Sequence, residues 1–207
     1  MSSRRAARGR EEVLRGASRV IARRGADATR FADVSAETGM AISTLQYSFG
    51  NREDMVLAAL HHTNADDVHR VELAIRGIDD PVERLRRFVR TTLRSEAGPA
   101  TARESWLIWV EYWRAAARDE DVSRQWYAVY EQWKDLLRPI LSDGSAAGVF
   151  RIDDPDAVAA QVLALFDGLC VPMVLGARAM PLRALTRVAL SGVAALVHCP
   201  TLSPATA

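Results

Sequence analysis

Residues 31–54, FADVSAETGMAISTLQYSFGNRED, predict two short helices that are joined by a tight turn. In the first helix Val34 faces a core, and Gly39 ends the helix because glycine readily adopts a positive φ. The second helix buries Leu45 and Phe49, which are spaced i and i+4. Its outward residues are polar and uncharged: Ser43, Thr44, Gln46, Tyr47 and Ser48. Such side chains can hydrogen-bond base edges and phosphates in a major groove, so the stretch is typical of a helix-turn-helix.

The run of residues 11–55 resembles the N-terminal domain of the TetR family of bacterial regulators. The matching residues are Gly39, Thr44, Leu45, Phe49, Gly50, Arg52, Glu53 and Met55. This chain has Gln46 where the family usually has tyrosine, and Ser48 at a later aromatic position. The resemblance implies a helix-turn-helix DNA-binding domain over residues 1–52, in which Arg52 takes the place of a lysine that contacts phosphate.

Charge is distributed unevenly along the 207 residues, whose net charge is +1. Residues 1–52 hold ten arginines against five acidic residues, whereas the rest of the chain holds seventeen basic and twenty-one acidic residues. A basic end on a mildly acidic body indicates a polyanion partner for that end, with Arg30 as a candidate phosphate contact. The alternative is an arginine-rich surface that serves solubility alone.

Cysteine usage and hydropathy indicate a cytoplasmic protein without a membrane partner. Cys170 and Cys199 are too few for a disulfide framework and lack the spacing of a zinc site, which fits a reducing compartment. No apolar run follows the basic N-terminus, so we expect no signal peptide. The most apolar stretch, residues 157–177, is interrupted by polar residues and a proline and predicts a buried helix instead of a membrane span. We expect no cofactor.

Apolar residues recur at helical spacing along the chain, and no segment shows the alternation of a strand, so we predict an all-α fold. A flexible basic arm is expected over residues 1–9. Nine helices follow, at about residues 11–24, 30–38, 42–49, 52–76, 81–96, 101–117, 121–141, 155–176 and 181–198. Thr29, Asp80 and Asp154 are candidate N-caps, and Pro139 is expected to bend its helix.

All five tryptophans lie between residues 106 and 133, on two consecutive predicted helices. Helical spacing places these aromatic residues on one face of each helix: Trp106, Trp109 and Trp113 on the first, and Trp126, Tyr130 and Trp133 on the second. If the two faces meet, they line a space that suits a small ligand. The alternative is a tightly packed core of large side chains.

The C-terminal half resembles that of TetR-family regulators in the subgroup that includes choline-responsive proteins. The resemblance implies an effector-binding and dimerisation domain over residues 53–207, with an unknown small-molecule effector. A tryptophan-rich site would attract a quaternary ammonium or a polyamine through cation–π contacts, or would stack a flat aromatic metabolite.

The last two predicted helices carry apolar faces that are too broad for one neighbour. These faces include Leu165, Leu169, Leu185 and Val188. Two such helices from each of two chains would form a four-helix bundle, the dimer interface that is usual in the family. The alternative is that these faces are buried within a single chain.

Sites with other chemistry find less support. His62, Asp66 and His69 fall at i, i+4 and i+7 of one predicted helix, which would suit metal ligands but equally a solvated face, and we expect no metal. No Ser/His/Asp, Cys/His or paired-carboxylate arrangement indicates a catalytic residue. We therefore expect a homodimeric repressor that binds a palindromic DNA operator and is released by an effector. The alternatives are a helical enzyme that uses the tryptophan-lined cavity, and a DNA-binding protein without an effector.

Overall fold

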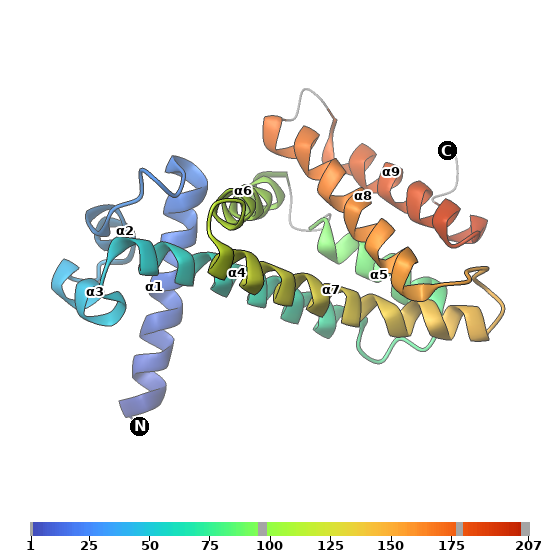
Figure 1. Ribbon diagram of the computed structural model, residues 1–207, viewed down its shortest axis with the longest axis horizontal. Helices are drawn as coiled ribbons and strands as arrows, with labels where there is room; N and C mark the ends of the chain where they lie inside the picture. Colours follow the sequence, from blue (N-terminus) through green and yellow to red (C-terminus); the bar gives the residue numbers. More distant parts are fainter. Residues whose placement is uncertain (1, 95–98, 177–179, 204–207) are drawn as a thin grey trace. The chain divides into compact units, whose positions relative to one another are not determined.

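The computed structural model describes residues 2–94, 99–176 and 180–203, and side chains within residues 9–94, 101–176 and 180–203. These residues form nine α-helices and a short 3-10 turn, with no strand among them, which confirms the all-α prediction (Figure 1). The elements are α1 (Ser2–Arg24), α2 (Phe31–Thr38), α3 (Ile42–Phe49), α4 (Arg52–Ile75), α5 (Pro81–Thr92), α6 (Pro99–Ala116), α7 (Glu120–Ala146), α8 (Pro155–Leu175), α9 (Leu182–Leu196) and η1 (Pro200–Leu202).

Two of the predicted helix caps are confirmed. The Asp80 carboxylate accepts hydrogen bonds, at 3.1 and 3.3 Å, from two backbone N–H groups in the first turn of α5. The Asp154 carboxylate accepts from the N–H groups of Asp156 (2.9 Å) and Ala157 (3.1 Å) in α8. Both aspartates precede a proline at the first helical position, where the missing N–H costs nothing and the ring fixes a helical φ.

Two predictions near the N-terminus are wrong. α1 begins at Ser2, so residues 2–9 extend the first helix instead of forming a flexible arm. Arg30, not Thr29, is the N-cap residue of α2. The Thr29 hydroxyl instead donates to the Gly25 carbonyl oxygen at 2.9 Å, and it is therefore not free to cap the next helix.

Two later helix ends also differ from those expected. α5 ends at Thr92, because Arg94 adopts a φ of 51°, which lies in the left-handed region. α7 continues through Pro139 to Ala146. A proline removes one helical hydrogen bond. The helix nevertheless continues, and Leu137, Ile140 and Leu141 on either side of the proline are buried in the core. Gly144 permits that packing, since a Cβ atom there would lie 2.0 Å from the Phe150 ring.

The helices divide into two compact units, residues 1–66 with 104–126, and residues 67–103 with 127–207. The first unit contains α1, α2, α3, the first part of α4, most of α6 and the start of α7. The second contains α5, most of α7, α8, α9 and η1. The boundary expected after residue 52 separates DNA binding from effector binding. Units defined by contacts do not test that division of function, so the boundary stays a prediction.

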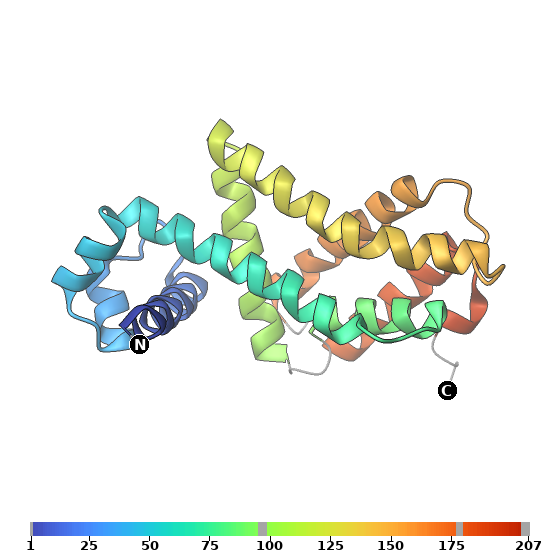
Figure 2. The ribbon, with the colours of Figure 1, turned by 90° about the horizontal axis from the view of Figure 1, so that it is seen from below.

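The second unit is built around aromatic packing and the pairing of its last two helices. Phe88 of α5 stacks on Phe166 of α8 at a centroid distance of 6.2 Å and meets Trp133 edge-on at 6.1 Å. α8 and α9 lie side by side in both ribbon views (Figure 1 and Figure 2). Gly192 allows this approach, because a Cβ atom at that position would lie 2.8 Å from the Leu165 side chain.

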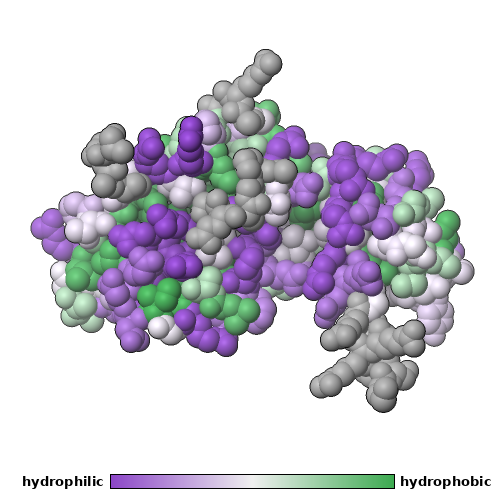
Figure 3. All heavy atoms as spheres, turned by 180° about the vertical axis from the view of Figure 1, so that it is seen from behind, coloured by the Kyte–Doolittle hydropathy of each residue, from purple (hydrophilic) through white to green (hydrophobic). Residues whose placement is uncertain are grey.

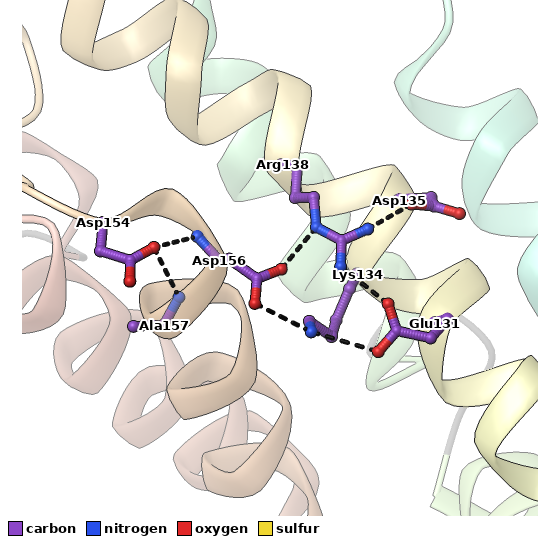
Figure 4. Close-up of polar contacts among 7 residues, drawn as sticks. All are labelled: Glu131, Lys134, Asp135, Arg138, Asp154, Asp156 and Ala157. Carbon is purple, nitrogen blue, oxygen red and sulfur yellow. Dashed lines mark hydrogen bonds and ion pairs between the residues drawn. The ribbon is translucent and has the colours of Figure 1, made fainter.

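A network of ion pairs joins α7 to the start of α8 within the second unit (Figure 4). Lys134 donates to Glu131 (3.2 Å) and Asp156 (3.0 Å). Arg138 donates to Asp156 (2.6 Å) and Glu131 (2.7 Å), and it also pairs with Asp135. The hydrogen bonds from the two cations hold the pKa values of Asp156 and Glu131 below their ordinary values. The carboxylates therefore stay ionised and fix one end of α8.

Hydrophobic surface remains on parts of the molecule, interspersed with hydrophilic side chains on the face drawn in Figure 3. In the α8–α9 pair the large exposed side chains are Val171, Leu175 and Val188. Among the described helices, α8 alone is long and apolar enough to cross a membrane by length and composition. However, 39% of its most apolar segment is buried within the protein, and a core helix passes the same test.

Candidate functional site

The helix-turn-helix consists of α2, a tight turn and α3. Gly39 adopts a φ of +71°, and its N–H donates to the Ser35 carbonyl oxygen at 2.8 Å, which ends α2 in the left-handed conformation. Val34 from α2 and Leu45 and Phe49 from α3 are buried. The residues chosen from the sequence as the core of this motif therefore pack inward, and they orient α3 on the first unit.

Ion pairs hold α1 against α2. The Glu37 carboxylate accepts hydrogen bonds from Arg19 (2.6 Å) and Arg23 (2.5 Å) of α1. These two arginines hold the pKa of Glu37 below its ordinary value. At the other end of α2, Asp33 accepts from the Arg30 N–H at 2.9 Å and pairs with Arg24 at 3.2 Å. Three arginines of α1 thus help to position the motif.

The polar side chains of α3 lie on its exposed surface. The five residues predicted to face DNA are all exposed: Ser43, Thr44, Gln46, Tyr47 and Ser48. The Tyr47 side chain is 93% exposed, which is unusual for an aromatic residue in a folded domain. Arg30, the predicted phosphate contact before α2, is also exposed. The structure brings these side chains together on one short helix and its neighbour, and their contact with DNA stays a prediction.

Arg52 has a structural role that the sequence pattern does not reveal. Its Nη1 atom donates to the carbonyl oxygens of Ala26 (2.7 Å), Asp27 (3.3 Å) and Thr29 (3.3 Å), in the loop that connects α1 to α2. Its other guanidinium nitrogens bond to Glu53 at 2.9 and 3.0 Å. The guanidinium therefore fixes the loop before α2, and the phosphate contact that we expect of it stays a prediction.

Another cation contacts the motif from α1. The Arg10 guanidinium lies 4.8 Å above the centre of the Phe49 ring, at cation–π distance. In the sequence, Arg10 is only one of several N-terminal arginines, and nothing in its spacing predicts this contact with α3.

The α1–α2 loop also contacts α6. Arg114 forms a bidentate pair with Asp27, with both N–O distances at 2.9 Å, and donates to Glu111 at 2.9 Å. Hydrogen bonds to Asp27 and Glu111 raise the pKa of Arg114. The Glu111 carboxylate lies so near Gly25 that a Cβ atom there would approach it to 3.2 Å. Because 87 residues separate Asp27 from Arg114, no local sequence pattern could have predicted this pair.

The six aromatic residues predicted to bind an effector fall in both units. The first unit holds Trp106, Trp109, Trp113 and Trp126, and the second holds Tyr130 and Trp133. In α6 the Trp109 ring lies 6.4 Å from both the Trp113 and Tyr112 rings, and Trp106 is buried. In the second unit Trp133 is buried against Phe88. That the six side chains enclose one ligand stays a prediction.

Tyr112 and His61 link α6 to α4 and were not singled out from the sequence. The Tyr112 hydroxyl is 3.0 Å from His61 Nδ1, and the two rings meet edge to face at 5.1 Å. Burial raises the pKa of Tyr112 to about 12. Burial also lowers the pKa of His61, and an interaction with the Gln125 side chain partly opposes this effect. A neutral, hydrogen-bonded pair therefore lies beside the aromatic residues of α6.

The four residues proposed for a dimer interface differ in exposure. Leu185 and Leu169 are buried inside one chain, and Leu165 is half-buried. Val188 is 43% exposed, so it is the one of the four that offers most surface to a partner. The assignment of an interface to these helices stays a prediction.

The histidine spacing in α4 yields pairs instead of a cluster. His62 Nε2 lies 3.5 Å from Asp66, and His69 Nδ1 lies 3.5 Å from Glu72. Within the described ranges, no group of three His, Cys, Asp or Glu side chains is arranged to hold a metal ion.

Comparison with known proteins supports the resemblance noted in the sequence. A family model described as bacterial regulatory proteins of the tetR family matches residues 13–59. A second, described as the C-terminal part of BetI-type transcriptional repressors, matches residues 81–198. The HTH-type transcriptional regulator BetI of Brucella abortus (strain 2308) is 23% identical over 115 residues, which cover 56% of this chain and 57% of that protein. The chain therefore matches a little over half the length of these curated relatives.

Solved structures agree over most of the chain. A transcriptional regulator from Saccharomonospora viridis, crystallised in complex with choline, has a TM-score of 0.81 at 27% identity, over 90% of this chain and 96% of that one. A TetR transcription regulator from Haloarcula marismortui has a TM-score of 0.78 at 19% identity, over 92% and 98% of the two chains, and shares the fold. The family models and the choline-bound structure are described as regulators, and none of them is described as an enzyme.

The helix-turn-helix, the helical body and the two family models agree with one another, and the second model covers more than half of the chain. The protein is a transcriptional regulator that belongs to the tetR family of bacterial regulatory proteins, with a C-terminal part of the BetI type.

Proposed function

We propose that this protein is a repressor that binds a palindromic operator as a homodimer and leaves it when a small-molecule effector binds. The observation that carries the proposal is the surface of α3, where five polar side chains are exposed on a helix held by a buried core. Residues 1–52 would bind DNA, and residues 53–207 would bind the effector and form the dimer. Such a regulator acts in the cytoplasm and needs no membrane partner.

Operator recognition would place the two α3 helices of a dimer in successive major grooves, about 34–36 Å apart. Gln46 suits adenine, since its amide NH2 can donate to N7 and its oxygen can accept from the N6 amine. Tyr47 is 93% exposed and is therefore free to contact a base or a phosphate. Arg30 would contribute a phosphate contact that is independent of sequence. Val171, Leu175 and Val188 supply exposed apolar surface on the α8–α9 pair that a second copy would cover.

For the effector we propose a small organic cation of the choline type. The regulator from Saccharomonospora viridis that binds choline is similar over most of its length. In this chain Trp109 and Tyr112 of α6 present adjacent aromatic rings, and aromatic faces attract quaternary ammonium groups. The same helix carries Arg114, which pairs with Asp27 in the loop before α2. A ligand that displaces α6 would therefore alter the support of the helix-turn-helix.

The test is a binding titration with labelled DNA from upstream of the protein's own gene, with and without competitor DNA. We expect a competitor-resistant complex, and we expect Gln46→Ala and Tyr47→Ala each to weaken it at least about fivefold. Gln132→Ala, at an exposed position of α7, is the matched control and should bind as the wild type does. Arg30→Ala should weaken binding to all DNA. It should also reduce the slope of log affinity against log salt concentration by about the amount expected for one phosphate contact. Unchanged affinity in both α3 variants would show that the exposed surface of α3 does not recognise the operator.

A further inference from the structure

The buried amide of Asn64 in α4 has no hydrogen-bond partner among the described residues. Asn64 is 0% exposed, and both Oδ1 and Nδ2 are buried without a hydrogen bond. Leaving an amide unpaired in the interior costs free energy, and nearly all buried amides in native proteins are therefore paired. An apolar residue at this position would avoid that cost. The presence of asparagine indicates a polar partner that comes from outside the chain.

The helix face that carries Asn64 also carries His61, and both residues belong to the first unit. His61 lies one turn earlier in α4, and residues spaced i and i+3 share a helix face. His61 is hydrogen-bonded to Tyr112 of α6, and Trp109 lies beside Tyr112. This face of α4 thus presents polar atoms next to the aromatic residues at which the proposed effector would bind.

The charges of these groups restrict what they can bind. Burial raises the pKa of Tyr112 to about 12, so its hydroxyl stays protonated. Burial also lowers the pKa of His61, which leaves the imidazole neutral near pH 7. An asparagine amide offers an acceptor and a donor side by side. A hydroxyl can satisfy both atoms, whereas a carboxylate can only accept from Nδ2 and a tetraalkylammonium can bond to neither.

We propose that Asn64 binds an uncharged hydrogen-bonding group of the effector, such as a hydroxyl, beside the aromatic side chains of α6. The inference rests on the proposed function, because it assigns one end of the small cation proposed there. It makes Asn64 the residue that distinguishes a hydroxylated cation from one that bears a carboxylate or no polar group.

The test titrates the full-length protein with three probes and follows tryptophan fluorescence. The probes are choline, which carries a hydroxyl, tetramethylammonium, which carries no hydrogen-bonding group, and glycine betaine, which carries a carboxylate. We expect the wild type to bind choline about tenfold more tightly than the other two, a ratio typical of one hydrogen bond to a buried group. Asn64→Leu should weaken choline binding about tenfold and leave tetramethylammonium binding unchanged. Gln132→Leu, at an exposed position, is the control and should keep the wild-type preference.

Thermal unfolding without ligand supplies an independent readout. Removing an unpaired buried amide should raise the Tm of Asn64→Leu above that of the wild type, while its choline affinity falls. A lower Tm would overturn the inference, because it would show that the amide has a partner within the protein. Asn64→Ala, which cannot overpack, serves as a second variant for the titration.

The outcomes separate this inference from the proposed function. If all three probes bind and Asn64→Leu weakens them equally or not at all, the assignment of Asn64 is overturned and the choline-type effector stands. If the wild type binds operator DNA but none of the three probes, the choline-type effector is rejected and the inference falls with it.

Discussion

The crossing of α1 and α2 depends on the absence of a side chain at Gly16. A Cβ atom there would lie 2.2 Å from Thr38 Cγ2, far inside van der Waals contact. Thr38 cannot easily turn away, because its hydroxyl donates to the Val34 carbonyl oxygen at 2.7 Å and β-branching restricts its rotamers. Gly16→Ala should therefore overpack this contact, at a cost of about 1–3 kcal/mol. Alanine recovers about 1 kcal/mol of helix propensity, which leaves a net loss of about 1 kcal/mol.

For a chain of this size, that loss corresponds to a Tm about 2–4 °C lower by circular dichroism. Thr38→Ser removes Cγ2 but keeps the hydroxyl, at a cost of about 1 kcal/mol for one methyl group. In the Thr38→Ser background the clash is gone, so Gly16→Ala should instead stabilise the protein by about 1 kcal/mol. A Gly16→Ala effect of the same sign in both backgrounds would refute the argument that this clash limits α1–α2 packing. Operator affinity should follow the same pattern, because α2 supports α3.

Three further predictions concern charged side chains. Asp27→Asn removes the ion pair with Arg114, which is worth at most about 1 kcal/mol because the Asp27 carboxylate is exposed. The effect of choline on operator affinity should therefore fall by no more than about fivefold. An unchanged effect would contradict a role of this pair in coupling the effector to DNA binding. Asp156→Asn should lower the Tm above pH 3.8, the ordinary pKa, and the difference from wild type should shrink as the pH falls from 3.8 through the depressed pKa of Asp156; a difference independent of pH would contradict the ionic role. Arg52→Lys keeps the charge but loses the guanidinium hydrogen bonds to the α1–α2 loop, so the Tm should fall by about 2–4 °C. The salt dependence of DNA binding should be retained. A variant as stable as the wild type would contradict the role of Arg52 in fixing this loop.

Features of the fold that depend on neighbours in the sequence were predictable. Leu45 and Phe49 are buried as their i, i+4 spacing indicates, Gly39 adopts the positive φ expected of a helix end, and Asp80 caps α5. Each of these properties depends on at most a few consecutive residues. The start of α1 was mispredicted, because an arginine-rich segment has the composition of a tail and its helical state does not follow from apolar periodicity.

The contacts around the α1–α2 loop could not be predicted for a different reason. The position of Arg52 after α3 predicts a phosphate contact. In the structure its guanidinium donates hydrogen bonds to backbone carbonyl groups that lie 23–26 residues earlier. Arg114 is one of 26 arginines in the chain, and only the folded structure shows that it reaches Asp27. Asn64 lies in a polar run of α4 whose composition suggests a solvated face, and its complete burial depends on how α4 packs.

The energies of these contacts restrict how an effector could control DNA binding. Allosteric coupling between two sites typically amounts to about 1–3 kcal/mol. The Arg114–Asp27 pair involves a carboxylate that is 81% exposed, and such a pair contributes at most about 1 kcal/mol. The Arg114–Asp27 pair alone is therefore too weak to carry most of a full response. Arg114, Glu111 and Arg52 approach the same few residues before α2, so a shift of α6 would change several weak contacts together. Single substitutions at this loop should then reduce the effector response only in part, whereas a combined substitution of Asp27 and Arg52 should remove most of it.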